Sequence, residues 1–303
     1  MNYRNIIKSR NLRVYILTFL SWVPDSIMLR LQYWLQTGRK LNLKNPKRFT
    51  EKLQLYKMKY RNPDMLRCTD KYEVRKYIAE KGFGEYLIPL IGVYNTAEEI
   101  DYSKLPSKFV AKTTDGGGGN QVLICKDKNT LSEEDFKERL SGWMSARKVK
   151  KHVGREWAYE NGYPRRIIIE QFISADEAMD KDLCDYKFFC FAGVPHYCQL
   201  IQDRSIEETI DFFDMDWRHM PFRGLNPKCS FANDVAECPN TFECMKSIAE
   251  SLSAGFPFVR VDLYSVNGHI YFGELTFYPA SGYGQFTPDE WDEKLGELLD
   301  ISH

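Results

Sequence analysis

Three charged residues stand inside apolar stretches near the carboxyl end of the chain. Arg260 and Asp262 lie within residues 258–264, and Glu274 lies within residues 271–276. Both stretches are rich in β-branched and aromatic residues, and Asn267-Gly268 between them is a turn signal, so we predict a β-hairpin. Two carboxylates and an arginine on one sheet face suit a magnesium–nucleotide site, because hard oxygen atoms hold Mg²⁺ and a fixed cation meets phosphate charge. The alternative is an internal salt bridge, with the second acid at a solvated edge.

The length of the hairpin turn decides whether the three charges share a face. A two-residue loop at Asn267-Gly268 puts Asp262 opposite Gly273 and turns Glu274 to the other face. A three-residue loop, 266–268, puts Arg260 opposite Glu274 and all three charges on one face. We therefore expect the site to form with the three-residue loop and to be broken by the two-residue loop.

A lysine and a glycine run form the second chemical signal. Lys112 lies near the end of the apolar run 108–113, and another apolar run, 121–125, follows the glycines Gly116, Gly117, Gly118 and Gly119. A hairpin loop of this kind can fold over a polyphosphate, because glycines let backbone N–H groups approach phosphates and the lysine adds positive charge. The GxxxxGK[ST] pattern is absent. A flexible turn with a snorkelling lysine is the alternative, but buried lysines without a partner are rare.

Two further segments offer nucleotide contacts. Residues 167–173 are expected to form a buried strand whose main chain can meet an adenine edge at Glu170, Gln171, Phe172 and Ile173. In the next strand, Asp185 can accept a hydrogen bond from a ribose hydroxyl, and Lys187 on the same strand face can reach phosphate. Taken singly, each of these segments favours an ordinary structural role.

Apolar periodicity and capping residues predict an irregular alternation of helices and strands. We expect helices over 50–60 with Thr50 as N-cap, from Thr69 or Asp70 to 81, and over 131–147, 241–254 and 288–299. Besides the hairpin, we expect strands over 87–94, 108–113, 121–125, 167–173 and 185–191. This irregular order favours an α+β fold over a doubly wound parallel sheet.

The composition is that of an ordinary globular protein. The chain has 303 residues, 43% hydrophobic and 28% charged, which is enough for one large domain or two closely joined ones. Eight cysteines without a CxxC pair indicate buried thiols in a reducing cytoplasm rather than a disulfide framework. Five scattered histidines give no zinc-site spacing.

Positive charge is concentrated at the amino end. Residues 1–60 carry thirteen Lys or Arg against Asp25 and Glu51, a net +11 that leaves −11 for the rest. The adjoining apolar run 14–23 is about half as long as a membrane-spanning helix, and no small-residue cleavage site follows it. We predict a helical segment on the inner face of the plasma membrane. Apolar residues that simply pack on the main domain are the alternative; they include Ile27, Leu29, Leu31, Trp34 and Leu35.

Taken in order, these pieces resemble the ATP-grasp superfamily. The resemblance implies two subdomains that clamp ATP, with Lys71 and Lys112 as the phosphate lysines, residues 170–173 as the adenine hinge and Asp185 at the ribose. It also implies Arg260 as the catalytic arginine and Asp262 and Glu274 as magnesium ligands. Thr276 takes the place where many members have a magnesium-binding asparagine, and it is the third expected metal ligand, with a hydroxyl that binds magnesium more weakly.

A closer resemblance covers roughly residues 40–300. The segments LNLKNPKRFTEKLQ, RCTDKYEVRKYI, DYKFFCFAG, FPFVRVDLY and YFGELTFYPASGYG together look like the TupA-like branch, which is linked to teichuronopeptide and other surface-polysaccharide synthesis. The resemblance implies a basic N-terminal region over 1–66, a small subdomain with the glycine loop over 67–172, and a large subdomain with the metal-binding hairpin over 173–303.

The implied activity is an ATP- and Mg²⁺-dependent carboxylate–amine ligase that works through an acyl phosphate. Its carboxylate substrate would be a surface polysaccharide or a precursor, and its second substrate would be an amino acid or another amine. We expect no nucleic acid among its partners. Arg260 and Lys112 would stabilise the charge that develops during transfer. A carboxylate pocket is expected after the second metal strand, lined by Ser281, Gly282 and Gly284.

Three alternatives stay open at this stage. The TupA-like branch is often labelled glycosyltransferase, which would need a metal held by an Asp-x-Asp pair. Asp214-Met215-Asp216 is the only such triplet, and we expect it to be a surface turn. A kinase on the same scaffold and a nucleotide-binding protein without catalysis are the other two, and the intact acids argue against the last.

Overall fold

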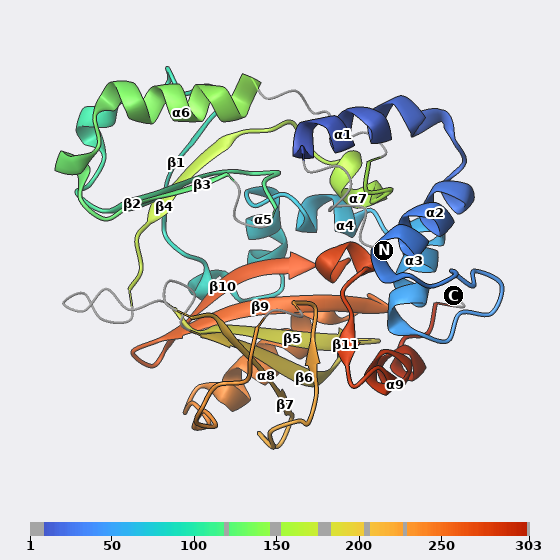
Figure 1. The fold of residues 1–303 in the computed structure, drawn as a ribbon. Helices are drawn as coiled ribbons and strands as arrows, with labels where there is room; N and C mark the ends of the chain where they lie inside the picture. Colours follow the sequence, from blue (N-terminus) through green and yellow to red (C-terminus); the bar gives the residue numbers. More distant parts are fainter. Residues whose placement is uncertain are drawn as a thin grey trace.

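Two antiparallel sheets organise the chain (Figure 1). The structure is a computed structural model that describes residues 9–117, 121–145, 153–174, 183–202, 207–226 and 229–301. The smaller sheet has the order β1-β4-β2-β3, from strands β1 (Leu90–Tyr94), β2 (Phe109–Thr113), β3 (Val122–Cys125) and β4 (Ile167–Gln171). The larger sheet has the order β10-β9-β5-β6-β7, from β5 (Asp185–Phe191), β6 (Val194–Gln202), β7 (Thr209–Asp214), β9 (Phe258–Val266) and β10 (His269–Thr276). The α+β prediction is therefore confirmed.

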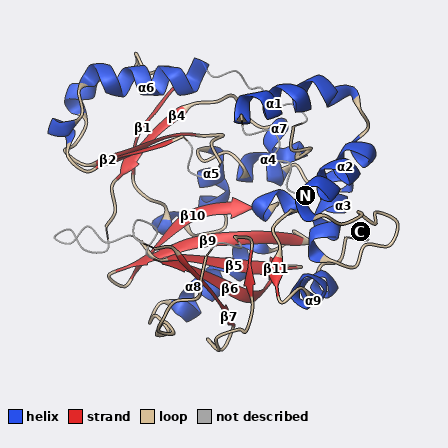
Figure 2. Ribbon diagram, viewed as in Figure 1, coloured by secondary structure: helices blue, strands red, loops and turns tan. Residues whose placement is uncertain are grey.

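Helices cover both sheets and extend the amino end (Figure 2). Their bounds are α1 (Arg10–Phe19), α2 (Asp25–Thr37), α3 (Phe49–Lys59), α4 (Asp64–Cys68), α5 (Glu73–Glu80), α6 (Glu133–Ser145), α7 (Trp157–Glu160), α8 (Phe242–Ser253) and α9 (Glu290–Leu298). A two-stranded pair, β8 (Arg223–Gly224) and β11 (Phe286–Thr287), lies beside the larger sheet. No described helix combines the length and the apolar content needed to cross a bilayer.

Each sheet has a hydrophobic core of its own. All seven residues of β5 are buried, and α8 packs against β5, β6 and β9. Phe49 of α3 joins this larger core, with its ring 4.9 Å from that of Phe258. In the smaller sheet, Phe109 packs edge-on against Phe136 of α6 at 5.6 Å. Because each sheet has its own core, each can present a stable surface to the space between the two sheets.

Helix starts were only partly predictable. We expected Thr50 to cap α3, but the cap is Arg48, two residues earlier, and a Glu51 carboxylate oxygen accepts from the N–H of Arg48 at 3.2 Å. Thr50 instead donates through its N–H and hydroxyl to Asp292 of α9. At α5, Asp70 accepts from the first exposed N–H groups, as expected of a cap, at 2.9 Å from both Tyr72 and Glu73.

Strands β6 and β7 were missed. Pro195, His196 and Gln199 interrupt the apolar alternation of β6, although its neighbours on both sides bury it. In β7, Asp211 is buried because it pairs with His219 at 2.7 Å. The turn after β7 is the surface feature we predicted: Asp214 accepts from the N–H groups of Asp216 and Arg218.

The β9–β10 hairpin closes with the two-residue loop, not the three-residue one. Asn267 and Gly268 have φ of 52° and 80°, and Val266 pairs with His269. A bulge then shifts the register between Phe272 and Glu274. The extra residue returns Glu274 to the face of Asp262, its direct cross-strand partner, so our expectation that a two-residue loop breaks the site was wrong.

Gly273 is the residue on which this bulge depends. A Cβ there would meet the Asp262 carbonyl oxygen at 3.0 Å and the Tyr264 ring at 3.2 Å. We expect Gly273→Ala to lower the free energy of unfolding by about 1–3 kcal/mol, because the strand backbone must give way. Urea denaturation measures this.

Gly142 of α6 is the matched control, since a Cβ there meets nothing within 4 Å. Gly142→Ala should leave stability unchanged or raise it by up to about 1 kcal/mol. Equal stability of the two variants would contradict the role given to Gly273.

Candidate active site

A cleft of about 770 Å³ lies between the two sheets. It brings together most of the predicted site residues, from segments far apart in the chain: Lys71, Lys112, Gly116, Glu170, Gln171, Phe172, Ile173, Asp185, Lys187, Arg260, Asp262 and Glu274. Gly118 and Gly119 lie outside the described residues. Gly117, Thr276, Ser281, Gly282 and Gly284 do not line the cleft.

On the larger sheet, Arg260 organises the acidic face. Its guanidinium donates to both carboxylate oxygens of Asp262, each at 2.7 Å, and also to Glu274 at 3.2 Å. Its side chain is 10% exposed and that of Asp262 1%, so this bidentate pair is screened from water. The Glu274 side chain is 45% exposed and is thus the acid open to the cleft.

Thr276 completes the link between Arg260 and Glu274. It lies directly opposite Arg260 on the paired strand. Its hydroxyl accepts from the guanidinium at 3.1 Å and donates to a Glu274 oxygen at 2.8 Å. In this arrangement the hydroxyl orients one carboxylate oxygen of Glu274.

A lysine joins the acids from the neighbouring strand. Lys187 of β5 is the register partner of Asp262 and forms an ion pair with it. The same ammonium group lies 2.7 Å from Asp185. Because β5 and β9 are adjacent, the predicted ribose acceptor and the predicted metal ligand share one cation.

The charges change the proton affinities of these groups. Burial alone would raise the pKa of Glu274, but Arg260, Lys187 and Lys71, with the Thr276 hydroxyl, lower it to about 2. Burial also works to lower the pKa of Arg260, yet Asp262 and Glu274 outweigh it and raise that pKa. Both groups are therefore ionised near neutral pH.

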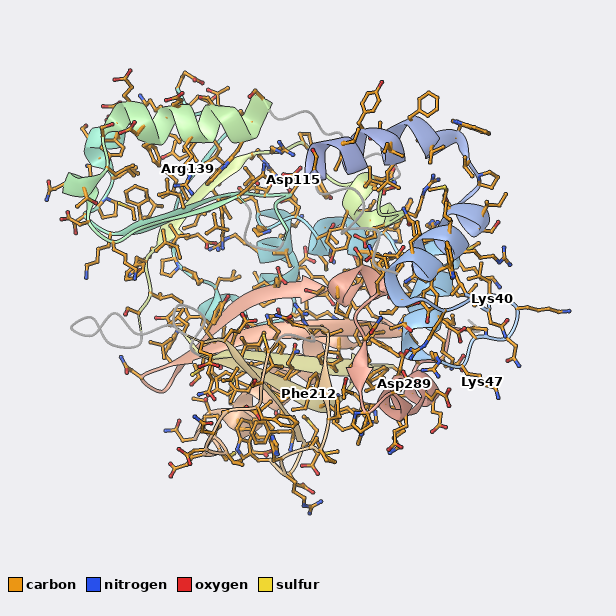
Figure 3. All side chains as sticks on the ribbon, in the orientation of Figure 1. Lys40, Lys47, Asp115, Arg139, Phe212 and Asp289 are labelled. Atoms are coloured by element: carbon orange, nitrogen blue, oxygen red, sulfur yellow. The ribbon has the colours of Figure 1, made fainter. Side chains whose placement is uncertain are left out.

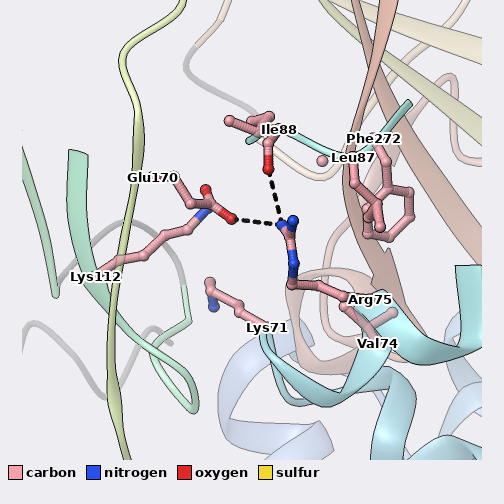
Figure 4. Close-up of a pocket in the computed structure, with 9 residues that line it drawn as sticks. Lys71, Val74, Arg75, Leu87, Ile88, Lys112, Glu170 and Phe272 are labelled. Atoms are coloured by element: carbon pink, nitrogen blue, oxygen red, sulfur yellow. Dashed lines mark hydrogen bonds and ion pairs between the residues drawn. The ribbon is translucent and has the colours of Figure 1, made fainter. Parts of the chain in front are cut away.

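On the opposite wall, three cations gather around Glu170 (Figure 4). Lys112 lies 2.6 Å from one carboxylate oxygen, and Arg75 lies 3.3 Å from the other. Arg75 also donates to the Ile88 carbonyl at 2.9 Å. Lys71 lines the same pocket, and its ammonium group donates to the Gly116 carbonyl.

The surroundings of Lys71 favour loss of the proton from its ammonium group. Burial lowers its pKa and Lys112 lowers it further, while Glu274 across the cleft opposes both. Its backbone N–H donates to Thr114 at the end of β2, at 2.9 Å. The residue is thereby held where an added anion would relieve the repulsion between the two lysines.

The loop after β10 lies outside the cleft lining and packs against α3. Its residues Ala280 and Ser281 have positive φ, 47° and 54°. Gln54 donates to the Gly282 carbonyl at 2.7 Å, and Gly282 and Gly284 are both buried against protein atoms. The two glycines thus shape the loop, which leaves Ser281 as its polar side chain.

The sequence did not direct us to Lys57, Glu156 or Tyr159. Lys57 of α3 is buried and donates to the Ser281 carbonyl at 2.7 Å. Ser281 in turn donates to Glu156, and the Tyr159 hydroxyl accepts from the N–H of Phe277. Helix α3 contains three lysines, Lys52, Lys57 and Lys59, and nothing in the sequence marks Lys57 as the buried one. Arg75 was also missed, although it follows Lys71 by four residues.

Comparison with known proteins agrees with this architecture. Residues 51–300 match the family model described as TupA-like ATPgrasp, so the chain belongs to that family and has its ATP-grasp fold. No curated protein matches. The family assignment predicted from the sequence motifs is therefore confirmed.

Several solved structures are similar at low identity. D-alanine–D-alanine ligase from Bacillus anthracis is 18% identical, with a TM-score of 0.43 over 77% of this chain and 66% of that one. The ATP-grasp ligase PsnB complexed with its minimal precursor is 11% identical, with a TM-score of 0.43 over 82% of this chain and 67% of that one. Phosphoribosylamine–glycine ligase from Thermotoga maritima is 16% identical, with a TM-score of 0.40 over 70% of this chain and 48% of that one. The chain spans just under two thirds of the first ligase's length.

The low pKa of Glu274 predicts a pH dependence of stability. Its pKa in the folded protein, about 2, lies below its ordinary value of 4.5, so its contribution exists above about pH 4.5 and is lost as the pH falls toward 2. After discounting for solvent screening of a partly exposed carboxylate, we expect about 1 kcal/mol. Glu274→Gln should flatten the fall in stability between about pH 5 and about pH 3.

Urea midpoints at several pH values test this, with Glu290→Gln on α9 as the control because that carboxylate pairs only at the surface with Lys294. The control should keep the wild-type pH dependence. An identical pH dependence for all three proteins would contradict the electrostatic account of Glu274.

Proposed function

We propose that this protein is an ATP-dependent carboxylate–amine ligase. The observation that supports this most is one cleft whose two walls carry complementary chemistry. Lys71 and Lys112 supply positive charge for phosphates from one side, and Arg260 with Asp262 and Glu274 faces them from the other. Such a cleft suits a polyphosphate with a divalent cation.

In this proposal the nucleotide lies along residues named above. The adenine edge meets the main chain of residues 170–173, and Asp185 accepts from a ribose hydroxyl. Lys71 binds the α- or β-phosphate, while Gly116 and Gly117 belong to the loop that covers the phosphates. Lys112 and Lys187 exchange their present carboxylate partners, Glu170 and Asp262, for phosphate oxygens.

The acids fit a magnesium ion, although no cluster of three such ligands occurs among the described residues. Glu274 offers an accessible carboxylate, and Asp262, its cross-strand partner, would offer a second if Lys187 moves to phosphate and one contact with Arg260 is given up. Thr276 keeps Glu274 in orientation. When bound, the ion would neutralise phosphate charge and fix the phosphate geometry.

The proposed reaction has two steps. A carboxylate oxygen of the substrate attacks the γ-phosphorus, the bond to the β-phosphate oxygen breaks, and ADP leaves an acyl phosphate. The amine nitrogen then attacks the carbonyl carbon, phosphate departs with the C–O electron pair, and the amine proton passes to water or phosphate. Arg260 and Lys112 stabilise the negative charge on the transferring group and on the tetrahedral intermediate.

For the substrates, we propose a uronic-acid carboxylate of a surface polysaccharide or its precursor, joined to an amino acid or amino sugar. Support comes from the TupA-like family. The loop around Ser281 follows β10 directly, although it does not line the cleft. The Asp-x-Asp alternative is less well supported, because Asp214 and Asp216 pair with Arg218 at the surface and do not line the cleft.

Ligand-induced stabilisation separates ATP from sugar-nucleotide chemistry. We expect Mg-ATP to raise the unfolding temperature, as binding to the folded state requires, and UDP-sugars to leave it unchanged. Stabilisation by UDP-sugars without any by Mg-ATP would refute the ligase proposal. ADP release that requires both a carboxylate and an amine then separates a ligase from a kinase, which needs only one acceptor.

Lys112→Met removes the cation nearest the glycine loop. We expect ADP release to fall by about 100-fold or more while the fold is kept, because one charge-stabilising donor is worth about that much. Lys104→Met is the matched control, since Lys104 is 81% exposed and far from the cleft lining. Full activity of Lys112→Met would remove this lysine from the mechanism.

A further inference from the structure

Helices α1 and α2 and the turn between them carry an apolar stripe that no other segment of the described residues covers. The stripe consists of large side chains that are each at least 42% exposed: Leu12, Tyr15, Phe19, Trp22, Ile27, Leu31 and Trp34. Three of its aromatic residues, Tyr15, Phe19 and Trp22, are 70%, 70% and 76% exposed. Exposed aromatic clusters of this kind mark interaction sites rather than ordinary surface.

Helical spacing places these residues on single faces. On α1, Leu12, Tyr15 and Phe19 follow at intervals of three and four residues, and on α2 Ile27, Leu31 and Trp34 do the same. The other face of α2 is already used, because Met28, Leu29 and Tyr33 are buried. The side chains of the stripe therefore take no part in the core packing of the described residues.

Arg155 fixes the corner between α1 and α2. Its side chain is 2% exposed, and it pairs with Asp25 at 2.7 Å. It also donates to the carbonyls of Leu20 at 2.9 Å and Val23 at 3.0 Å, which lie at the break between the two helices. The aromatic side chains are therefore held outward by a buried contact with the body.

The charge around the stripe is positive. Residues 1–60 carry thirteen basic residues against two acids. Among the described side chains, Arg30 lies within α2 next to Leu31, and Lys40, Lys44 and Lys47 are exposed just after this helix. Figure 3 shows Lys40 and Lys47 projecting outward on the side of the molecule where α2 lies. An apolar stripe with a basic border is complementary to an anionic lipid surface.

We propose that the α1–α2 hairpin docks on the surface of an anionic lipid bilayer. The aromatic rings enter the interfacial layer, and the basic side chains meet headgroup phosphates. The helices have 10 and 13 residues, whereas a spanning helix needs about 20, so they lie along the surface. Of the apolar residues weighed between membrane and packing, Leu29 is buried against the protein, whereas Ile27, Leu31 and Trp34 are exposed.

Docking also orients the loop that follows β10 and contains Ser281. Gln32 of α2 donates to the Val153 carbonyl at 3.0 Å and accepts from the Tyr283 hydroxyl at 2.9 Å. The α1–α2 pair of helices is thereby joined to this loop. If the ligase function proposed above holds, a substrate borne on a membrane lipid would reach this loop from the docked side.

Vesicle co-sedimentation of the full chain tests the docking. We expect wild type to bind phosphatidylglycerol-containing vesicles, to bind phosphatidylcholine vesicles weakly, and to lose affinity as salt rises from about 0.1 M to about 0.5 M. The triple variant Tyr15→Ser, Phe19→Ser, Trp22→Ser should bind at least about tenfold less. Val194→Ser with Val235→Ser is the control, since these side chains are 50% and 61% exposed elsewhere.

Charge variants separate the two parts of the surface. Arg30→Gln with Lys40→Gln should weaken binding to anionic vesicles severalfold, whereas Lys76→Gln with Lys104→Gln should not. Equal vesicle binding by wild type and the aromatic triple variant would overturn the proposal. So would a wild-type dimer in light scattering that becomes a monomer in the triple variant without any vesicle binding, because the stripe would then be covered by a second copy. Neither measurement depends on ligase activity.

Discussion

The buried contact between Arg260 and Asp262 is the interaction on which the candidate site depends. Without its partner, Asp262 would keep only Lys187 as an ion-pair partner among the described residues, and Arg260 would keep only Glu274, inside the larger sheet. Removal of one partner from such a buried pair is typically far more costly than the pair itself is stabilising. The bidentate geometry at 2.7 Å fixes both groups. Glu274 is then placed by Arg260 and Thr276, so the open acid of the cleft takes its position from the buried one.

A second constraint is charge balance across the cleft. The cations that would bind phosphates are held by carboxylates in this structure: Lys112 by Glu170, and Lys187 by Asp185 and Asp262. Incoming phosphate oxygens must therefore compete with internal carboxylates. Such competition favours a ligand that brings several negative charges together with a cation, because the displaced acids then acquire a new partner. A neutral or singly charged ligand gains little from the same exchange.

Sequence patterns selected residues that mostly line one cleft, but they did not predict the backbone that aligns them. Charged residues inside apolar strands, and a lysine before a glycine run, are visible without a structure because burial makes them costly. The Gly273 bulge was not visible, since glycine in a strand is compatible with several local geometries, and the expectation that a two-residue loop breaks the site was wrong for that reason. Contacts made by residues distant in the chain, such as Lys57 with Ser281 and Arg75 with Glu170, depend on tertiary packing that no local pattern encodes. Strand β6 was hidden by its polar residues, because burial by neighbouring strands overrides local preference.

The central claim is that the acids oriented by Arg260 hold a divalent cation together with a nucleotide. Titration of Mn²⁺ in the presence of ADP, followed by the electron paramagnetic resonance signal of free Mn²⁺, measures this directly. We predict that wild type and Glu290→Gln bind Mn²⁺ only when ADP is present, and that Glu274→Gln loses most of this binding while its fold is unchanged. Equal Mn²⁺ binding by Glu274→Gln and wild type would contradict the account, because the cation would then be held elsewhere.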